Sequence, residues 1–122
     1  MPDSLTFGNL LSLSQHQGFI TENSPAEITA AQNNYAIGNY TVLRLSTDAS
    51  RAITGFTGGF RGRILIIINV GAQDIVFANN SASSAAGNKI ITGTGADVTI
   101  VATKSIIFYY DKTGAVWRLL AS

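Results

Sequence analysis

The residues that could carry chemistry in this chain are few and lie far apart. His16 is the only histidine and cysteine is absent, so no second imidazole and no thiolate can join it at the spacing of a metal site. The serines lack an evident general base for the same reason. We therefore expect a surface or capping role for His16, and we predict no catalytic site, no metal site and no cofactor.

Turn formation accounts for the acidic side chains. Asp48, Asp74, Asp97 and Asp111 stand in or beside predicted turns, where a carboxylate accepts hydrogen bonds from nearby backbone amides. The segment Gly93–Asp97 (GTGAD) is only superficially similar to a phosphate loop, because it lacks a third glycine and no helix follows it. Nucleotide binding is not expected.

One loop carries a functional hypothesis beside a structural one. Residues 79–88 (NNSASSAAGN) are small and polar, which suits an exposed tip that contacts a partner or a sugar, or else a flexible connection. The candidate contact residues of this loop are Asn79, Asn80, Ser81, Ser83, Ser84 and Asn88.

A second hypothesis concerns the basic, glycine-rich segment before the most apolar run of the chain. Arg61 and Arg63 could meet an acidic neighbour across a subunit boundary, or could be solvated charges at the rim of the domain. The predicted subunit or capsid interface consists of Arg61, Arg63, Ile64, Ile66 and Ile68.

The run 62–70 (GRILIIINV) is the element that must position these arginines. Five consecutive aliphatic residues leave no polar face, and isoleucine favours a strand over a helix. The run therefore predicts a central strand buried on both faces. Since the chain offers no amphipathic helix, we expect the cover to come from another sheet or another subunit.

Composition narrows the class of protein. A chain of 122 residues is one domain, and without cysteine it must fold by its core alone. Charged residues make up 12%, about half the usual fraction, which suggests surface hidden in an oligomer. The net charge of +1 is scattered, so nucleic acid is not expected as a partner. We also expect no signal peptide, no membrane span, and synthesis in a cytoplasm.

Short strand-like runs recur from Tyr40 onward and predict an all-β fold. The eight runs are YTVLRLS, RAIT, GRILIIINV, QDIVFAN, NKIIT, DVTIV, SIIFYY and AVWRLL. The breaks are too short for crossover helices, so we predict a mostly antiparallel β-sandwich, a jelly-roll-like domain or a small barrel. Residues 1–38 are polar and irregular and are predicted to form an extended N-terminal arm, with the β-sandwich domain at residues 39–122.

One hairpin can be specified from its turn. Asp111 opens a turn that Gly114 should close with a positive φ, so SIIFYY and AVWRLL should pair. That pairing brings Tyr110 near Trp117 in an aromatic cluster that also includes Phe108 and Val116. We expect Trp117 to belong to the core.

The order of elements from Ile53 to Leu120 resembles the β-structured modules of bacteriophage virion proteins, which occur in tail fibres, head fibres and capsid decoration proteins. The resemblance rests on a glycine-rich turn before a long aliphatic strand, Asn69 and Gly71 at the end of that strand, and the Ser/Ala/Asn loop closing at Asn88. It extends to Gly95-Ala96-Asp97 before a strand and Tyr110-Asp111 before Trp117-Arg118. It implies a homotrimer located in the virion.

The short arm and single β domain, without a fibre shaft, favour a capsid decoration (cement) protein among these roles. Such a protein would be assembled in the host bacterial cytoplasm, bind the major capsid protein or another virion protein, and stabilise the shell through many weak contacts. The alternative is a tail-fibre or receptor-binding module whose loops recognise a host-surface glycan. Neither role makes the chain an enzyme.

Overall fold

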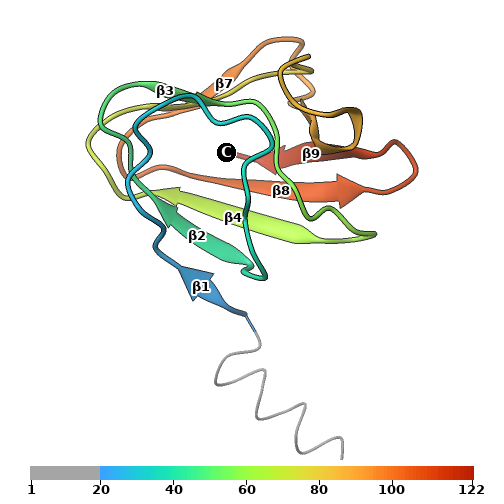
Figure 1. Ribbon diagram of the computed structural model, residues 1–122, viewed down its shortest axis with the longest axis horizontal. Coiled ribbons are helices and arrows are strands. Elements are labelled where there is room, and N and C mark those ends of the chain that lie inside the picture. The colour runs from blue at the N-terminus through green and yellow to red at the C-terminus, as the bar shows by residue number, and fades with distance from the viewer. Residues whose placement is uncertain (1–19) are drawn as a thin grey trace, which may run out of the picture.

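The computed structural model describes residues 20–122, which form a larger and a smaller β-sheet packed against each other (Figure 1). In spatial order, the larger sheet contains β1 (Glu22–Asn23), β2 (Val42–Leu45), β4 (Ile64–Asn69), β8 (Ser105–Asp111), β9 (Val116–Ala121) and β6 (Ile90–Ile91). The smaller sheet contains β3 (Arg51–Ile53), β5 (Ile75–Phe77) and β7 (Val98–Ile100), and a 3-10 turn, η1 (Ala86–Asn88), precedes β6. Among these residues, no helix is both long and apolar enough to span a bilayer.

The predicted β-sandwich is confirmed, and each of the eight strand-like runs contains an observed strand, β2 to β9. The runs predict the strands correctly because β-branched and aromatic residues between tight turns favour extended backbone. The strand that sequence patterning missed is β1, which is two residues long and polar.

The prediction of a mostly antiparallel sheet is wrong. Pairing is parallel for β1–β2, β2–β4, β3–β5 and β6–β9, and antiparallel for β4–β8, β5–β7 and β8–β9. Parallel neighbours need a crossover connection, which is usually a helix. Here the chain leaves β2, runs through β3 in the opposite sheet and returns as β4, so a strand of the second layer serves as the crossover (Figure 1).

The first half of the described chain consequently winds like a coil, with each turn stacked on the one before. Parallel partners are 20 residues apart at Glu22 and Val42, and 24 residues apart at Val42 and Ile66. The smaller sheet shows the same step of 24 residues between Arg51 and Ile75. Such stacking places residues that are distant in sequence on one continuous face.

Residues 20–38 belong to this coil, which corrects part of the arm prediction. Ile28 and Ile37 are buried in the core, and parallel bridges join Ile28 to Thr47 and Tyr35 to Phe56. The segment is extended as expected, but it shares the core of the domain because its isoleucines fill space between the sheets. An arm separate from the domain can therefore apply only to residues 1–19, which lie outside the described residues.

The apolar strand β4 has one covered face and one open face. Leu65, Ile67 and Asn69 are fully buried between the sheets, whereas Ile66 and Ile68 are half-buried and Ile64 is 37% exposed. The smaller sheet covers the inner face, as the sequence led us to expect. The described residues of this chain leave the outer face uncovered.

An aromatic cluster fills the space between the sheets. Phe56 lies 5.2 Å from Phe108 and 5.5 Å from Trp117 between ring centroids, and Tyr110 lies 5.1 Å from Trp117. Trp117 is fully buried, and its indole Nε1 donates a hydrogen bond to the Phe56 carbonyl at 3.1 Å. The prediction that Trp117 belongs to the core is confirmed.

The hairpin between β8 and β9 forms as predicted, with Tyr110 opposite Trp117 and Asp111 opposite Val116. The Asp111 carboxylate accepts a hydrogen bond from the Gly114 amide at 3.1 Å. However, the residue with positive φ is Ala115, at 55°, and not Gly114. The turn therefore places its left-handed residue one position later than the glycine suggested.

A pair of substitutions in β4 tests the assignment of its two faces. We expect Ile67→Asp to destabilise the domain by at least about 4 kcal/mol, because a carboxylate there must lose its hydration without gaining a partner. Ile66→Asp, one residue away on the outer face, should cost the single folded subunit only about 1 kcal/mol through lower strand propensity, apart from any stability that contact with other copies adds. Urea denaturation followed by circular dichroism measures both, and equal losses of stability would contradict the assignment.

Candidate functional site

The predicted interface residues do not lie on one surface, because side chains alternate along a strand. Ile64, Ile66 and Ile68 point to the open face of the larger sheet, and Arg63 points the opposite way. Arg61 is exposed on the loop that precedes β4. The structure thus keeps the three isoleucines on one face of the sheet and places both arginines off that face.

Arg63 is buried, so it is neither a solvated charge at the rim of the domain nor an exposed side chain that could contact a neighbouring subunit. Only 7% of the residue is exposed, and its guanidinium donates to three backbone carbonyls. Nη1 donates to Gly58 at 2.8 Å, and Nη2 donates to Gly38 at 2.7 Å and to Tyr40 at 3.0 Å. These bonds tie the loop before β2 to the loop before β4. Burial lowers the pKa of Arg63 below its ordinary value.

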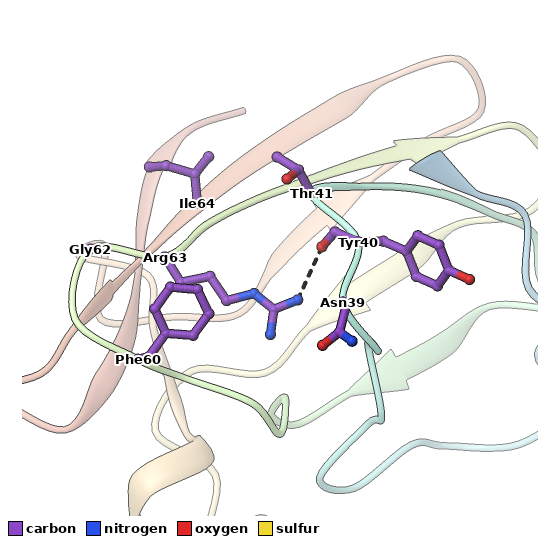
Figure 2. Close-up of a pocket in the computed structure, with 7 residues that line it drawn as sticks. All are labelled: Asn39, Tyr40, Thr41, Phe60, Gly62, Arg63 and Ile64. Atoms are coloured by element: carbon purple, nitrogen blue, oxygen red, sulfur yellow. Dashed lines mark hydrogen bonds between the residues drawn. The ribbon is translucent and has the colours of Figure 1, made fainter. Parts of the chain in front are cut away.

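A hollow of about 560 Å³ opens beside this guanidinium, where the parallel strands β2 and β4 begin. We call it the Phe60 hollow, and its lining residues are Asn39, Tyr40, Thr41, Phe60, Gly62, Arg63 and Ile64 (Figure 2). Its volume lies within the range of small-molecule sites in proteins.

Phe60 supplies the aromatic surface of the hollow. Its side chain is 59% exposed, and the Arg63 Cζ atom lies 5.4 Å from the centroid of its ring. Figure 2 shows the Phe60 ring beside the Arg63 side chain and the Tyr40 ring turned away from both. The hollow therefore combines one exposed ring, one buried cation and the polar groups of Asn39 and Thr41.

The loop 79–88 is more firmly held than an exposed, flexible tip. Ser84 is buried; its Oγ accepts a hydrogen bond from the Asn34 amide at 2.9 Å and lies 2.7 Å from the Thr54 hydroxyl. The Asn34 side chain in turn accepts from the Ala85 amide at 2.7 Å and from Asn88 Nδ2 at 2.9 Å. The prediction of an exposed contact is wrong for Ser84, because this loop closes over Asn34 and Thr54, which lie 50 and 30 positions away in the sequence.

The two ends of that loop differ from its middle. The Asn79 side-chain oxygen accepts from the Thr92 amide at 3.0 Å, and the Asn79 amide donates to the Asp97 carboxylate at 2.9 Å. Asn80 and Ser83 are exposed, and Ser81 is half-buried. Asn80 and Ser83 remain as candidate contact residues on the surface.

Asp48 and Asp111 act locally, as turn chemistry predicts. Asp48 pairs with Arg51 at 2.8 Å and Asp111 with Arg118 at 2.8 Å, and each hydrogen bond from arginine lowers the pKa of its carboxyl group. Asp97 departs from the pattern because it bonds across to Asn79.

Within residues 20–122, no cluster of three or more His, Cys, Asp or Glu side chains could hold a metal ion. His16 lies outside the described residues. At the Phe60 hollow, the described residues provide an aromatic face, hydrogen-bonding groups and one cation. These groups could bind a ligand.

Sequence reasoning missed Asn39, Tyr40, Thr41 and Phe60 as a group. Phe60 follows Gly59 in a glycine-rich break, and an aromatic residue there has no neighbouring strand to bury it. The position of Phe60 in this break was the signal from which sequence reasoning could have found it. The contribution of residues 39–41 depends on the parallel pairing of β2 with β4, which the pattern of apolar residues does not encode.

Two glycine substitutions test how firmly Arg63 is held. Gly58 and Gly62 have nearly the same positive φ, 78° and 79°, so alanine should cost each about 1 kcal/mol. A Cβ atom on Gly58 would lie 2.7 Å from Arg63 Nη1, whereas nothing lies within 4 Å of one on Gly62. Gly58→Ala should therefore lose about 1–2 kcal/mol more than Gly62→Ala, because the guanidinium must leave its carbonyls. Equal denaturation midpoints would show that these hydrogen bonds add little.

Comparison with protein-family models matches residues 23–118 to the phage depolymerase C-terminal beta sandwich domain. Neither the curated proteins nor the solved structures contain a match to the chain. The match begins inside β1 and ends inside β9, so it covers both sheets and the Phe60 hollow. It agrees with the resemblance to β-modules of phage virions that the sequence indicated. The chain belongs to the phage depolymerase C-terminal beta sandwich domain family and is a structural β-module of a bacteriophage.

Proposed function

We propose that this domain is a receptor-binding module of a phage tail-fibre protein and that it recognises a host-surface glycan at the Phe60 hollow. The observation that carries the proposal is the exposed Phe60 ring next to fixed polar groups. Ligand sites typically pair an apolar or aromatic surface with a few positioned hydrogen-bonding groups. A sugar offers matching surfaces, since one face of its ring is apolar and its edges carry hydroxyl groups.

The surroundings of Phe60 make it suitable for such a contact. Gly59 and Gly62 flank the turn, and Arg63 is held by three hydrogen bonds, so the base of the hollow is rigid before a ligand arrives. A preorganised site loses little conformational entropy on binding. An exposed phenyl ring gains by leaving water when a ligand covers it.

The same observations weaken the cement role that we expected as the main function. An anchoring arm at residues 1–38 was part of its support, and residues 20–38 are packed into the domain. The family takes its name from depolymerases and not from capsid decoration proteins. We therefore propose that the domain belongs to the tail of the virion and that it binds glycan without cleaving it.

We further propose that the domain works as a homotrimer whose subunits meet through the open face of the larger sheet. Val42, Ile66 and Ile107 are register partners and form an apolar row across β2, β4 and β8 on that face. Ile64 and Leu120 are 37% and 58% exposed there. A chain with only 12% charged residues has little polar surface to keep such a face in water.

Charges at both margins of this face suit contact between identical copies. Arg44 lies 4.0 Å from Glu22 at one margin, and Arg118 pairs with Asp111 at the other. Each margin therefore carries both signs of charge, so a symmetry-related copy can meet it without repulsion.

Replacing the exposed ring tests the glycan proposal. We expect Phe60→Ala to weaken binding to host cells at least about tenfold, because the ring is the main apolar contact of the hollow. The thermal midpoint should stay unchanged, since the side chain is mostly exposed. Binding is measured with labelled protein on host cells and on purified surface polysaccharide.

Val101→Ala is the matched control, because Val101 is also exposed, at 47%, and follows β7 in the other sheet. It should leave binding intact. Equal binding by wild type and Phe60→Ala would refute the site, and binding to purified capsids with none to cells would restore the cement function.

Ile66→Asp tests the proposed trimer contact, since it places a carboxylate in the middle of the apolar row. We expect folded monomers in place of trimers, because an unpaired charge cannot be buried at the interface. Light scattering across a dilution series gives the mass, with Val101→Ala as the control. Trimers that persist in Ile66→Asp would locate the contact elsewhere.

A further inference from the structure

We propose that the glycan bound at the Phe60 hollow is acidic, and that Arg63 binds the carboxylate of one of its sugar units. This inference depends on the proposed glycan-binding function and adds the chemical class of the ligand. It rests on the state of the Arg63 guanidinium, whose charge the described part of the chain buries without neutralising.

The positive charge of Arg63 has no counter-ion among the described residues. Arg63 is 93% buried, yet all three of its hydrogen-bond acceptors within residues 20–122 are neutral carbonyl oxygens. A buried ion without a counter-ion is costly, whereas a charge in a poorly hydrated site attracts an anion more strongly than one in water. The lowered pKa of Arg63 has this same cause, desolvation without a compensating negative charge.

The Arg63 guanidinium also keeps hydrogen-bond donors that the described residues do not use. A guanidinium has five N–H donors, and the three bonds to Gly58, Gly38 and Tyr40 use three of them. Nε–H and one Nη1–H have no acceptor among the described residues. These two N–H groups lie at different edges of the guanidinium, because Nε–H is adjacent to Nη2 and not to Nη1, so one carboxylate oxygen would accept one of them. A hydrogen bond from a guanidinium to a carboxylate is still stronger than one to a hydroxyl group, because both partners are charged.

The walls of the hollow carry no negative charge. None of its seven lining residues is acidic, and the exposed Arg61 stands between the lining residues Phe60 and Gly62. The hollow therefore favours anions over neutral and cationic ligands. Because the Arg63 guanidinium lies over the Phe60 ring, with Cζ 5.4 Å from the ring centroid, a sugar carboxylate bound to the guanidinium would lie beside the ring and not between the two groups.

An array of bacterial surface oligosaccharides tests this inference, with each carboxyl-bearing glycan printed beside its carboxyl-reduced, neutral counterpart. The full-length wild-type protein should bind at least one carboxylated glycan about tenfold or more above its reduced partner, as expected for charge-assisted hydrogen bonds. Added sodium chloride should weaken the carboxylated complex more than the neutral one. Arg63→Gln should abolish the preference, and Arg51→Gln, on β3 in the smaller sheet, should retain it.

The outcomes separate this inference from the proposed function. Equal binding of reduced and carboxylated glycans, lost in Phe60→Ala, would overturn the acidic ligand and leave the glycan site in place. Binding to no glycan would overturn both. Should Arg63→Gln fail to fold, the reduced-glycan comparison and the salt titration on wild-type protein decide the question by themselves.

Discussion

Contact between the two sheets through Phe56 is the interaction on which the rest of this structure depends. The Phe56 ring is fully buried, touches Phe77, Phe108 and Trp117, and thereby joins both layers at one point. Its carbonyl accepts the Trp117 indole hydrogen, so the only buried indole donor is satisfied there. Two residues after Phe56 the glycine-rich turn to Arg63 begins. The position of the hollow is therefore set by aromatic packing in the core.

The second constraint is the passage of the chain between the layers. Because β2, β3 and β4 alternate between the two sheets, β2 and β4 become parallel neighbours and begin at the same end of the sandwich. The loops before these strands are then adjacent, and Arg63 can bond to carbonyls on both. The same topology gathers Val42, Ile66 and Ile107 on the open face, so one arrangement of strands produces both the hollow and the proposed contact between subunits.

Loops in this domain are held by buried polar side chains, since the chain has no disulfide to do so. Asn69, at the end of β4, donates to the Gln73 and Ile100 carbonyls and accepts from the Gly71 amide. Ser84 and Arg63 likewise hold their own loops in place through hydrogen bonds to distant parts of the chain. Buried polar groups are usually hydrogen-bonded, and Arg63 differs from Asn69 in keeping two N–H donors without an acceptor among the described residues. These donors are the basis for the ligand that we propose.

From the sequence alone we could predict the positions of β2 to β9, the β-sandwich fold, the pairing of β8 with β9, and the burial of Trp117 in the core. These properties depend on neighbours along the chain: runs of branched residues, and a turn opened by Asp111. Only the tertiary structure decided that β2 and β4 are parallel, that Arg63 is buried and that Ser84 is covered by residues near Asn34. Each of these depends on partners twenty to fifty residues away, whose choice follows from packing across two layers and from register, because a shift of one residue would turn Arg63 to the opposite face.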